Sequence, residues 1–323
     1  MHTQPTDNKD MANDNPNINS MIITGATSSL GTALVDRCIQ EGTRVLALVH
    51  PGSKKAERIT RHELVTIREC GLEDMKDFTD TAGYDALVHL AWAATNGDAE
   101  RGKLRPQVDN ISYALDAVEM ASRCGCKVFV GAGSQAEYGR TDETLTDTTP
   151  TDPETPYGMA KLCAGQMTRL ACKNMGIRHV WSRILSSYGP RYLPGTVINH
   201  TINELLKGNS PALSAGDQIW DFIYCDDVAK ALYLLAAKGR DGEIYVIGSG
   251  ESKPLKEYLE TVRNIVSPGA KLGLGEVPYS DSTVMHLACD ISKLKEDTGY
   301  TPDVSFEEGI RRTVAWNKNE WGL

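Results

Sequence analysis

The stretch Met21-Ile22-Ile23-Thr24-Gly25-Ala26-Thr27-Ser28-Ser29-Leu30-Gly31 decides the fold of this 323-residue chain. Its first five residues are typical of a short buried strand, and residues 32–39 continue with apolar side chains at helical spacing. The glycine-rich turn between them would direct bare N–H groups and the helix dipole at an anion. A second strand at 44–49 supplies the β-α-β context that such a motif needs. The stretch therefore predicts a phosphate-binding turn, with an ordinary α/β turn as the alternative.

The rest of the chain continues the alternation of strands and helices. Further strands are expected at 64–68, 85–90, 127–132 and 179–184. Helices are expected at 30–41, 54–60, 99–123, 157–174, 196–207, 226–238, 254–266 and 304–318. Such alternation predicts an α/β fold in which a doubly wound parallel sheet carries helices on both faces.

A second informative feature is Ser134, followed past a polar loop by Tyr157-Gly158-Met159-Ala160-Lys161. A tyrosine and a lysine four residues apart on a helix lie on the same face. A phenol titrates near about 10, and a neighbouring ammonium lowers that pKa. With a serine hydroxyl to hold the oxygen of a carbonyl or alcohol, the set would move a proton on and off that oxygen while a hydride moves at the carbon. A solvated helix face is the alternative for such a pair.

These two motifs, in this order, resemble the extended short-chain dehydrogenase/reductase family, and most closely its NAD(P)-dependent nucleotide-sugar epimerase, dehydratase and reductase branch. The resemblance runs from about residue 20 to residue 319. Further segments match the family pattern in the expected order: Val88-His89-Leu90-Ala91, Asp109-Asn110-Ile111, 133–139, 183–190, 220–229, and Tyr300-Thr301-Pro302 with 306–310.

The resemblance implies a Rossmann-type doubly wound parallel sheet with a small C-terminal substrate-binding lobe. Residues 20–185 would form the NAD(P)-binding domain and carry the catalytic residues. Residues 186–323 would form mostly the substrate lobe, with 220–248 and the closing helix returning to the Rossmann core. Residues 1–19 have almost nothing to bury, so we expect a disordered tail there.

The motifs and the resemblance together assign roles to individual residues. The catalytic set would be Ser134, Tyr157 and Lys161. Cofactor contacts are expected from Gly25, Thr27, Ser28, Ser29, Leu30, Gly31, His50, Ser53, Leu72, Leu90, Ala91, Trp92, Asn110, Tyr157, Lys161 and Leu185. Substrate contacts are expected from Trp92, Thr95, Ser134, Gln135, Ser186, Arg191 and Trp220.

The resemblance also implies a homodimer, because relatives pair two helices of each subunit about a two-fold axis. Here these helices would be 99–123 and 157–174, and both carry more apolar side chains than one sheet face needs. The interface candidates are Ile111, Ala114, Leu115, Val118 and Met120 on the first, and Leu162, Cys163, Gln166, Met167, Leu170 and Ala171 on the second. Loops that cover the surplus are the alternative.

Bulk properties exclude several classes of function. A formal net charge of −9 argues against a nucleic-acid or anionic-membrane partner. No apolar run approaches the roughly 20 residues of a membrane span, and the N-terminus lacks an apolar signal core. The eight cysteines form no Cys-x-x-Cys pair and no zinc spacing. We therefore expect a reduced, cytoplasmic protein without a metal.

The end of the second strand bears on the cofactor. NAD-preferring relatives usually place a carboxylate there to accept from the ribose hydroxyls. The segment Val49-His50-Pro51-Gly52-Ser53-Lys54-Lys55 has none. His50, Ser53 and Lys54 would instead suit a 2′-phosphate, through hydrogen bonds and positive charge. We expect NADP(H) to be preferred, with NAD(H) and a merely solvated basic helix start as the alternatives.

Three reactions share this scaffold: reduction of a 4-keto sugar, 4-epimerisation and 4,6-dehydration. Relatives that dehydrate carry an Asp-Glu pair directly after the serine, where this chain has Gln135-Ala136. Glu137 stands one position too late and is expected to point elsewhere. Dehydration is therefore the least expected. NADPH suits a reductase, so we favour reduction of the 4-keto group of a nucleotide-linked 6-deoxy sugar, with an NAD-dependent 4-epimerase as the alternative.

The substrate end departs from the family pattern at Ser186 and Trp220, where relatives often have Asn and a diphosphate-binding Arg. Tryptophan cannot pair with phosphate, so either Arg191 or Arg140 replaces that contact or the substrate is not a nucleotide sugar. The second case would describe a small-carbonyl ketoreductase. A cofactor sensor without turnover is a further alternative, but it would not need the serine, tyrosine and lysine together.

Overall fold

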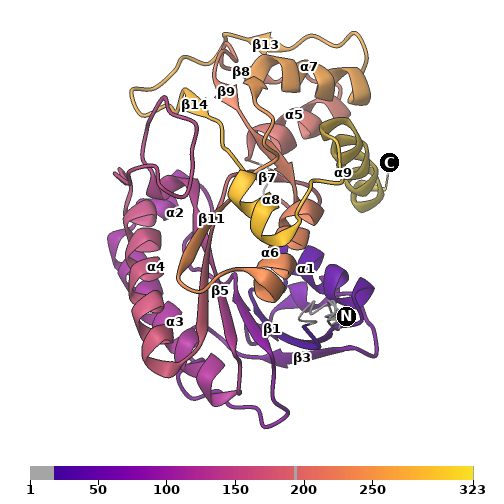
Figure 1. Ribbon diagram of the computed structural model, residues 1–323. Coiled ribbons are helices and arrows are strands. Elements are labelled where there is room, and N and C mark those ends of the chain that lie inside the picture. The colour runs from indigo at the N-terminus through magenta and orange to yellow at the C-terminus, as the bar shows by residue number, and fades with distance from the viewer. Residues whose placement is uncertain (1–17, 193–194, 323) are drawn as a thin grey trace, which may run out of the picture.

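A parallel sheet forms the centre of the computed structural model, which describes residues 18–192 and 195–322 (Figure 1). Within this part of the chain the sheet has seven strands, in the order β11-β6-β5-β4-β1-β2-β3. The strands are β1 (Ser20–Thr24), β2 (Arg44–Val49), β3 (Val65–Glu69), β4 (Ala86–His89), β5 (Val128–Ser134), β6 (Arg178–Ile184) and β11 (Glu243–Ile247). Strands β1 to β6 lie within two residues of the predicted positions, and the predicted α/β class is confirmed.

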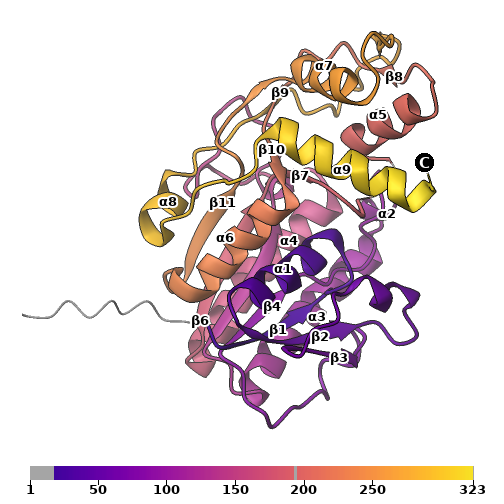
Figure 2. The ribbon, with the colours of Figure 1, turned by 90° about the vertical axis from the view of Figure 1, so that its right-hand side faces the viewer.

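Helices cover both faces of this sheet, as a doubly wound fold requires (Figures 1 and 2). The pair α3 (Leu104–Arg123) and α4 (Pro156–Met175) packs on one face. The pair α1 (Ser29–Gln40) and α6 (Cys225–Lys238) packs on the other. The order reverses between β1 and β4, so the crevice at their carboxyl ends is the topological switch point at which ligands bind in such folds.

Several segments differ from the sequence-based expectation. The predicted helix 99–123 is interrupted, because α2 (Asp98–Arg101) ends at Gly102 and α3 begins two residues later. Residues 54–58 form a 3-10 helix instead of an α-helix. Strand β11 and the short helix α8 (Ser292–Thr298) were not predicted.

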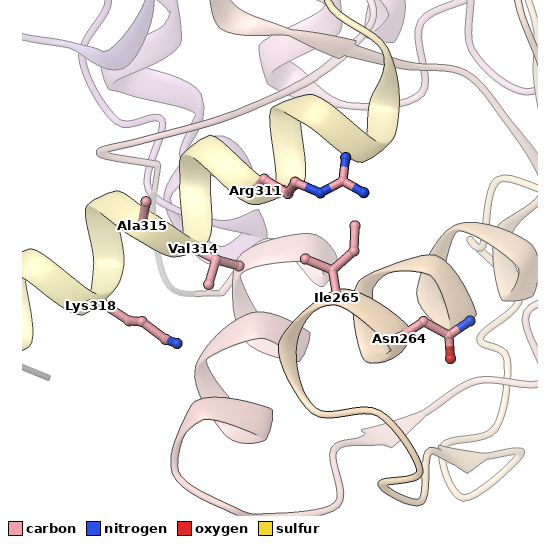
Figure 3. A pocket seen from close by; sticks show the side chains of 6 residues that line it. All are labelled: Asn264, Ile265, Arg311, Val314, Ala315 and Lys318. Carbon is pink, nitrogen blue, oxygen red and sulfur yellow. The ribbon is translucent and has the colours of Figure 1, made fainter.

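The remaining elements lie beyond the carboxyl ends of the central strands, at the top of Figure 1. The helices there are α5 (Val197–Leu206), α7 (Leu255–Val266) and α9 (Phe306–Trp321). Short strands join them: β7 (Ser186–Tyr188) with β10 (Phe222–Tyr224), β8 (Ala212–Leu213) with β13 (Gly273–Leu274), and β9 (Ile219–Trp220) between β12 (Lys253–Pro254) and β14 (His286–Leu287). A cleft of about 500 Å³ lies between α7 and α9, with Arg311 and Lys318 at its wall (Figure 3), and contains none of the predicted site residues.

The last two residues of the predicted tail belong to the folded body. Ile18 is buried, and its carbonyl oxygen accepts a hydrogen bond from Thr43 Oγ1 at 2.6 Å. The N–H of Asn19 donates to Asp85 Oδ2 at 2.8 Å. The prediction of a disordered tail is therefore wrong for residues 18 and 19, because Ile18 has an apolar site to fill, and residues 1–17 lie outside the described part.

Candidate active site

The glycine-rich turn after β1 packs directly against neighbouring backbone, which leaves no room for side chains at its glycines. Gly25 has φ +68°, and a Cβ there would lie 2.7 Å from the backbone nitrogen of Ala91. A Cβ on Gly31 would lie 2.3 Å from the carbonyl oxygen of Gly25. Ser28 caps α1 by accepting from the Gly31 N–H at 3.0 Å. The preceding N–H groups of Ser29 and Leu30 remain available to the phosphates of a dinucleotide.

The residues that follow β4, Leu90 and Ala91, form a wall beside the glycine-rich turn. Thr24 Oγ1 accepts hydrogen bonds from the N–H groups of Leu90 and Ala91, at 3.1 and 3.2 Å. It also bonds to His89 Nδ1 at 2.9 Å, and burial lowers the pKa of His89 to about 3. This histidine is therefore neutral at physiological pH, and the wall is held by hydrogen bonds without a charge of its own.

Two amides of α3 hold the loop that follows β4. Asn110 Oδ1 accepts from the N–H of Ala93 at 2.9 Å, and its amide nitrogen donates to the Ala93 carbonyl at 3.0 Å. Gln107 accepts from Trp92 Nε1 at 2.9 Å and donates to the Ala94 carbonyl at 3.0 Å. Gln107 was missed from sequence, although its place one turn before Asn110 is a signal that could have revealed it.

The structure brings the predicted catalytic residues together at the carboxyl end of β5. Ser134 ends that strand, while Tyr157 and Lys161 lie on the first two turns of α4. A Cβ on Gly158 would lie 2.2 Å from the Ala136 carbonyl oxygen, so this glycine lets α4 begin directly against the segment after Ser134. Lys161 Nζ donates to the Ala132 carbonyl at 2.7 Å. The arrangement suits proton transfer at one oxygen atom.

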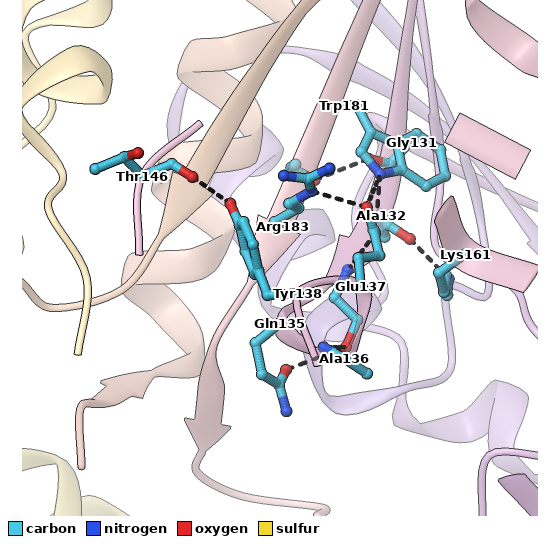
Figure 4. Close-up of polar contacts among 12 residues, drawn as sticks. Gly131, Ala132, Gln135, Ala136, Glu137, Tyr138, Thr146, Lys161, Trp181 and Arg183 are labelled. Carbon is cyan, nitrogen blue, oxygen red and sulfur yellow. Dashed lines mark hydrogen bonds and ion pairs between the residues drawn. The ribbon is translucent and has the colours of Figure 1, made fainter. Parts of the chain in front are cut away.

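A buried ion pair joins Glu137 and Arg183 at the end of β5 (Figure 4). The fully buried carboxylate of Glu137 accepts from Arg183 Nε at 2.8 Å, from Trp181 Nε1 at 3.0 Å and from the Ser134 N–H at 2.9 Å. Glu137 thus points away from the site and into the core, as predicted. Three glycines leave room for the Trp181 ring. A Cβ at Gly131, Gly133 or Gly165 would clash with that ring.

Comparison with known proteins decides the family. Residues 21–248 match the model of the NAD dependent epimerase/dehydratase family. The chain belongs to this family. One curated relative is a putative UDP-glucose 4-epimerase of Methanocaldococcus jannaschii, 27% identical, covering 93% of this chain and 98% of the relative. Another is a dTDP-glucose 4,6-dehydratase of Neisseria gonorrhoeae, 31% identical, covering 92% and 95%.

Solved structures agree on the fold of the family. The UDP-N-acetylglucosamine 4-epimerase of Methanobrevibacter ruminantium, in complex with UDP-N-acetylmuramic acid, superimposes with a TM-score of 0.83 at 24% identity. The match covers 94% of this chain and 99% of that one. From the family model and the curated relatives, the chain is an enzyme of the nucleotide-sugar epimerase/dehydratase family. The solved structure confirms the Rossmann-type sheet that its sequence predicted.

Electrostatics around the family's tyrosine and lysine are dominated by burial. Burial raises the pKa of Tyr157, against which the Arg101 guanidinium and a hydrogen bond with Ser134 act. Burial lowers the pKa of Lys161 to about 7, while Glu137 favours and Arg101 disfavours its charged form. Lys161 Nζ lies 3.5 Å from the centroid of the Trp92 ring, and 5.8 Å from that of Tyr157. Arg101, absent from the predicted site, lies 5.1 Å from the Tyr157 ring centroid.

Ser186 and Trp220 contact each other. They are the two residues at the substrate end that depart from the family pattern. Trp220 Nε1 donates to Ser186 Oγ at 2.8 Å. Lys253, which the sequence did not single out, is the cross-strand partner of Trp220 in the β12–β9 pair. Its Nζ lies 4.4 Å from the Tyr258 ring centroid. This part of the site therefore combines an indole with a cation.

Arginines 140 and 191, the predicted replacements for the family's diphosphate contact, are already engaged. Arg140 is paired with Glu154 at 2.7 Å and donates to the Asp281 carbonyl, at the edge of a cleft of about 380 Å³. Arg191 Nη1 donates to Thr32 Oγ1 on α1 at 3.2 Å. Neither bond places a guanidinium at Trp220.

The predicted cofactor residues outside these walls are spread over three strand ends. His50 and Ser53 lie in the turn after β2, and Leu72 follows β3. The turn after β2 also holds a carboxylate that the sequence did not place there, because the Gly52 N–H donates to Glu69 Oε1 at 2.9 Å. Glu69 ends the neighbouring strand β3, in register with Val49. Leu185 follows β6, with its N–H donating to the Ile247 carbonyl at 2.9 Å.

The last predicted substrate residues lie near the serine or in the loop after β4. Gln135 Oε1 accepts from Ser134 Oγ at 3.1 Å. Thr95 lies in the loop between β4 and α2. Thr27, the remaining predicted cofactor residue, lies in the turn between β1 and α1. Their contacts with a ligand remain predictions.

Proposed function

We propose that this family member is an NAD(P)-dependent reductase of the 4-keto group of a nucleotide-linked 6-deoxy sugar. The observation that carries the proposal is that Ser134, Tyr157 and Lys161 come together while the two residues after the serine, Gln135 and Ala136, can act neither as acid nor as base. Ser134 would hold the carbonyl oxygen, and Tyr157 would donate a proton to it. The nicotinamide, when bound, supplies the hydride to the carbon.

Dehydration needs a side chain that removes a proton next to the carbonyl and another that protonates the leaving hydroxyl. The amide of Gln135 and the methyl group of Ala136 can do neither. Glu137 is held by Arg183, Trp181 and the Ser134 backbone, so its carboxylate serves the scaffold. These residues support redox chemistry at one carbon.

The polar and basic residues that follow β2 in sequence support reduction over epimerisation. His50 is exposed there, and Ser53 and Lys54 follow it at the start of the 3-10 helix. Together they would present hydrogen-bond donors and positive charge to the 2′-phosphate of NADP(H). NADPH is the form that a reductase consumes and then releases, so a site for its extra phosphate supports net reduction.

Lys253 and Trp220 support a nucleotide-linked substrate. Residues directly opposite in an antiparallel pair lie on the same face. Lys253 would therefore neutralise the diphosphate of the substrate beside the Trp220 indole. Neither Arg140 nor Arg191 is placed to do so.

We further propose that the enzyme is a homodimer. Large apolar side chains are exposed on α3 and α4, namely Leu104, Val108, Met159, Met167, Leu170 and Met175. Leu104 is 70% and Leu170 59% exposed, which is costly for a face left in water. A second copy would cover these adjacent helices. Three of the predicted interface residues are wrong, because Ala114, Val118 and Met120 are buried within the subunit.

The proposal is tested by presenting CDP-, dTDP-, UDP- and GDP-linked 4-keto-6-deoxy sugars with NADPH or NADH and following the nicotinamide absorbance. We expect one nucleotide series to consume NADPH, with the Tyr157→Phe variant as the inactive control. Interconversion of 4-hydroxy sugars without net consumption of cofactor would replace the reductase with an epimerase.

One observation favours that second candidate, an NAD-dependent 4-epimerase. Glu69 brings a carboxylate to the turn after β2, where it would repel a 2′-phosphate and accept from a free ribose hydroxyl. A Glu69→Gln variant separates the two candidates. An epimerase that uses Glu69 would lose affinity for NAD, whereas a reductase would gain affinity for NADPH.

A further inference from the structure

Arg101 occupies a position over the catalytic tyrosine that the mechanism above does not use. It ends the short helix α2, which lies between Gly97 (φ +83°) and Gly102. Its guanidinium carbon lies 5.1 Å from the centroid of the Tyr157 ring, within the range of a cation–π contact. The Arg101 side chain is exposed, whereas the edge of the same tyrosine ring meets Trp92, with 6.3 Å between ring centroids. Tyr157 thus has both an indole and a guanidinium as neighbours.

The lysine of the catalytic set is less suited to stabilise a phenolate in this chain. Lys161 is buried, donates to the Ala132 carbonyl and lies closer to the Trp92 ring than to Tyr157. Burial brings its pKa to about 7, so a large part of the population is neutral at physiological pH. An arginine stays charged throughout the range in which enzymes work.

We propose, on the basis of the reductase function above, that Arg101 is a positioning residue that sets the proton affinity of Tyr157. In the reduction, the hydride reaches the carbonyl carbon, the C=O bond becomes C–O–H, and the proton comes from the Tyr157 hydroxyl. The nicotinamide is oxidised, the sugar is reduced, and a phenolate remains until solvent reprotonates it. The guanidinium stabilises that phenolate, which makes the phenol a stronger acid.

The charged and titratable groups around Tyr157 and Lys161 determine in which direction Arg101 shifts the pKa of each. The Glu137 carboxylate acts on both groups from the core, and the Arg101 guanidinium acts on them from α2. His89, on β4, is neutral at physiological pH. Arg101 disfavours the protonated form of Tyr157 and that of Lys161. Its removal must therefore raise the pKa of both groups, and every limb of a pH profile that depends on them must move to higher pH.

The test compares Arg101→Gln, Arg101→Lys and the control Arg105→Gln, which removes an exposed arginine at the start of α3. We expect Arg101→Gln to lower kcat for reduction at neutral pH by about tenfold and to move the alkaline limb to higher pH. Arg101→Lys should restore much of both, and Arg105→Gln should match the wild type. An unmoved limb, or a rise in KM alone, would overturn the proposal in favour of a structural or substrate-binding role.

A second readout does not require turnover. Tyrosine labelled with ¹³C at Cζ allows the ionisation of Tyr157 to be followed by NMR in the substrate-free protein, with Tyr157→Phe to assign its signal. We expect Tyr157 to titrate at higher pH in Arg101→Gln than in the wild type, and coincident titrations would refute the proposal. If this shift occurs but no nucleotide sugar is reduced, the proposed function fails and the role of Arg101 in tuning Tyr157 stands.

Discussion

The buried Glu137–Arg183 ion pair, which also holds the Ser134 N–H, makes a quantitative prediction. Arg183→Met removes the cation that faces Glu137 and leaves a side chain of similar length. The Arg183 side chain is 4% exposed and that of Glu137 is 0% exposed. The carboxylate would then remain in the core with two neutral donors, Trp181 Nε1 and the Ser134 N–H.

The expected loss of unfolding free energy is about 3–5 kcal/mol, the usual effect of leaving one member of a buried pair without its partner. Arg312→Met is the matched control, because the Arg312–Glu308 pair has the same 2.8 Å separation but is nearly half exposed on both sides. Its expected cost is about 0–1 kcal/mol. A Glu137→Gln/Arg183→Met double variant should regain part of the loss, because no unpaired charge is left.

The assay is equilibrium urea denaturation at one protein concentration, followed by tryptophan fluorescence, with the midpoint and slope fitted for all four proteins. Activity adds a second readout, since Glu137 holds the Ser134 backbone and its displacement should lower kcat more than it changes KM. The reasoning is refuted if Arg183→Met is no less stable than Arg312→Met, or if the double variant is the least stable of the series.

Three further predictions concern the catalytic residue, the N-terminus and the dimer. Tyr157→Phe should lower turnover by roughly 10²–10⁴-fold while cofactor affinity stays within a few-fold, because the ring still packs; more than about a tenth of the wild-type rate would remove the tyrosine from its role. Ile18→Ala should cost about 2–5 kcal/mol in the same denaturation assay, since the side chain is buried; an unchanged midpoint would mean that the first residues contribute no packing. Light scattering should give about twice the chain mass of 35.3 kDa for the wild type and a monomer for Leu170→Glu; a monomeric, fully active wild type would contradict the dimer.

The sequence was a good guide wherever a property was local. Strands β1 to β6 were predictable because each is a run of apolar residues between turn residues, and Gly25 and Gly31 were predictable because their spacing has a steric purpose. Strand β11 was missed although it is apolar, because its pairing with β6 and not its composition makes it part of the sheet. Ile18 was missed because one buried residue leaves no periodic pattern.

The sequence predicted which residues meet at the end of β5, but much less of what surrounds them. Ser134, Tyr157 and Lys161 form a recognisable motif, whereas Arg101 and Glu69 enter the site from elements far away in the chain. Nothing in the spacing of these two residues indicates where they point. The lowered pKa of Lys161 could not be predicted from the sequence either, because it depends on all the residues that bury the amine.

The most direct test of the central claim is to follow the hydride itself. NADPH deuterated at the transferred position of the nicotinamide is incubated with the nucleotide-linked 4-keto-6-deoxy sugar that the enzyme accepts, and the product is analysed by NMR and mass spectrometry. The account predicts one deuterium at C4 of the sugar for each NADPH oxidised, and none with Tyr157→Phe. Sugar epimers that exchange without net oxidation of cofactor, or cofactor consumption without deuterium at C4, would contradict it.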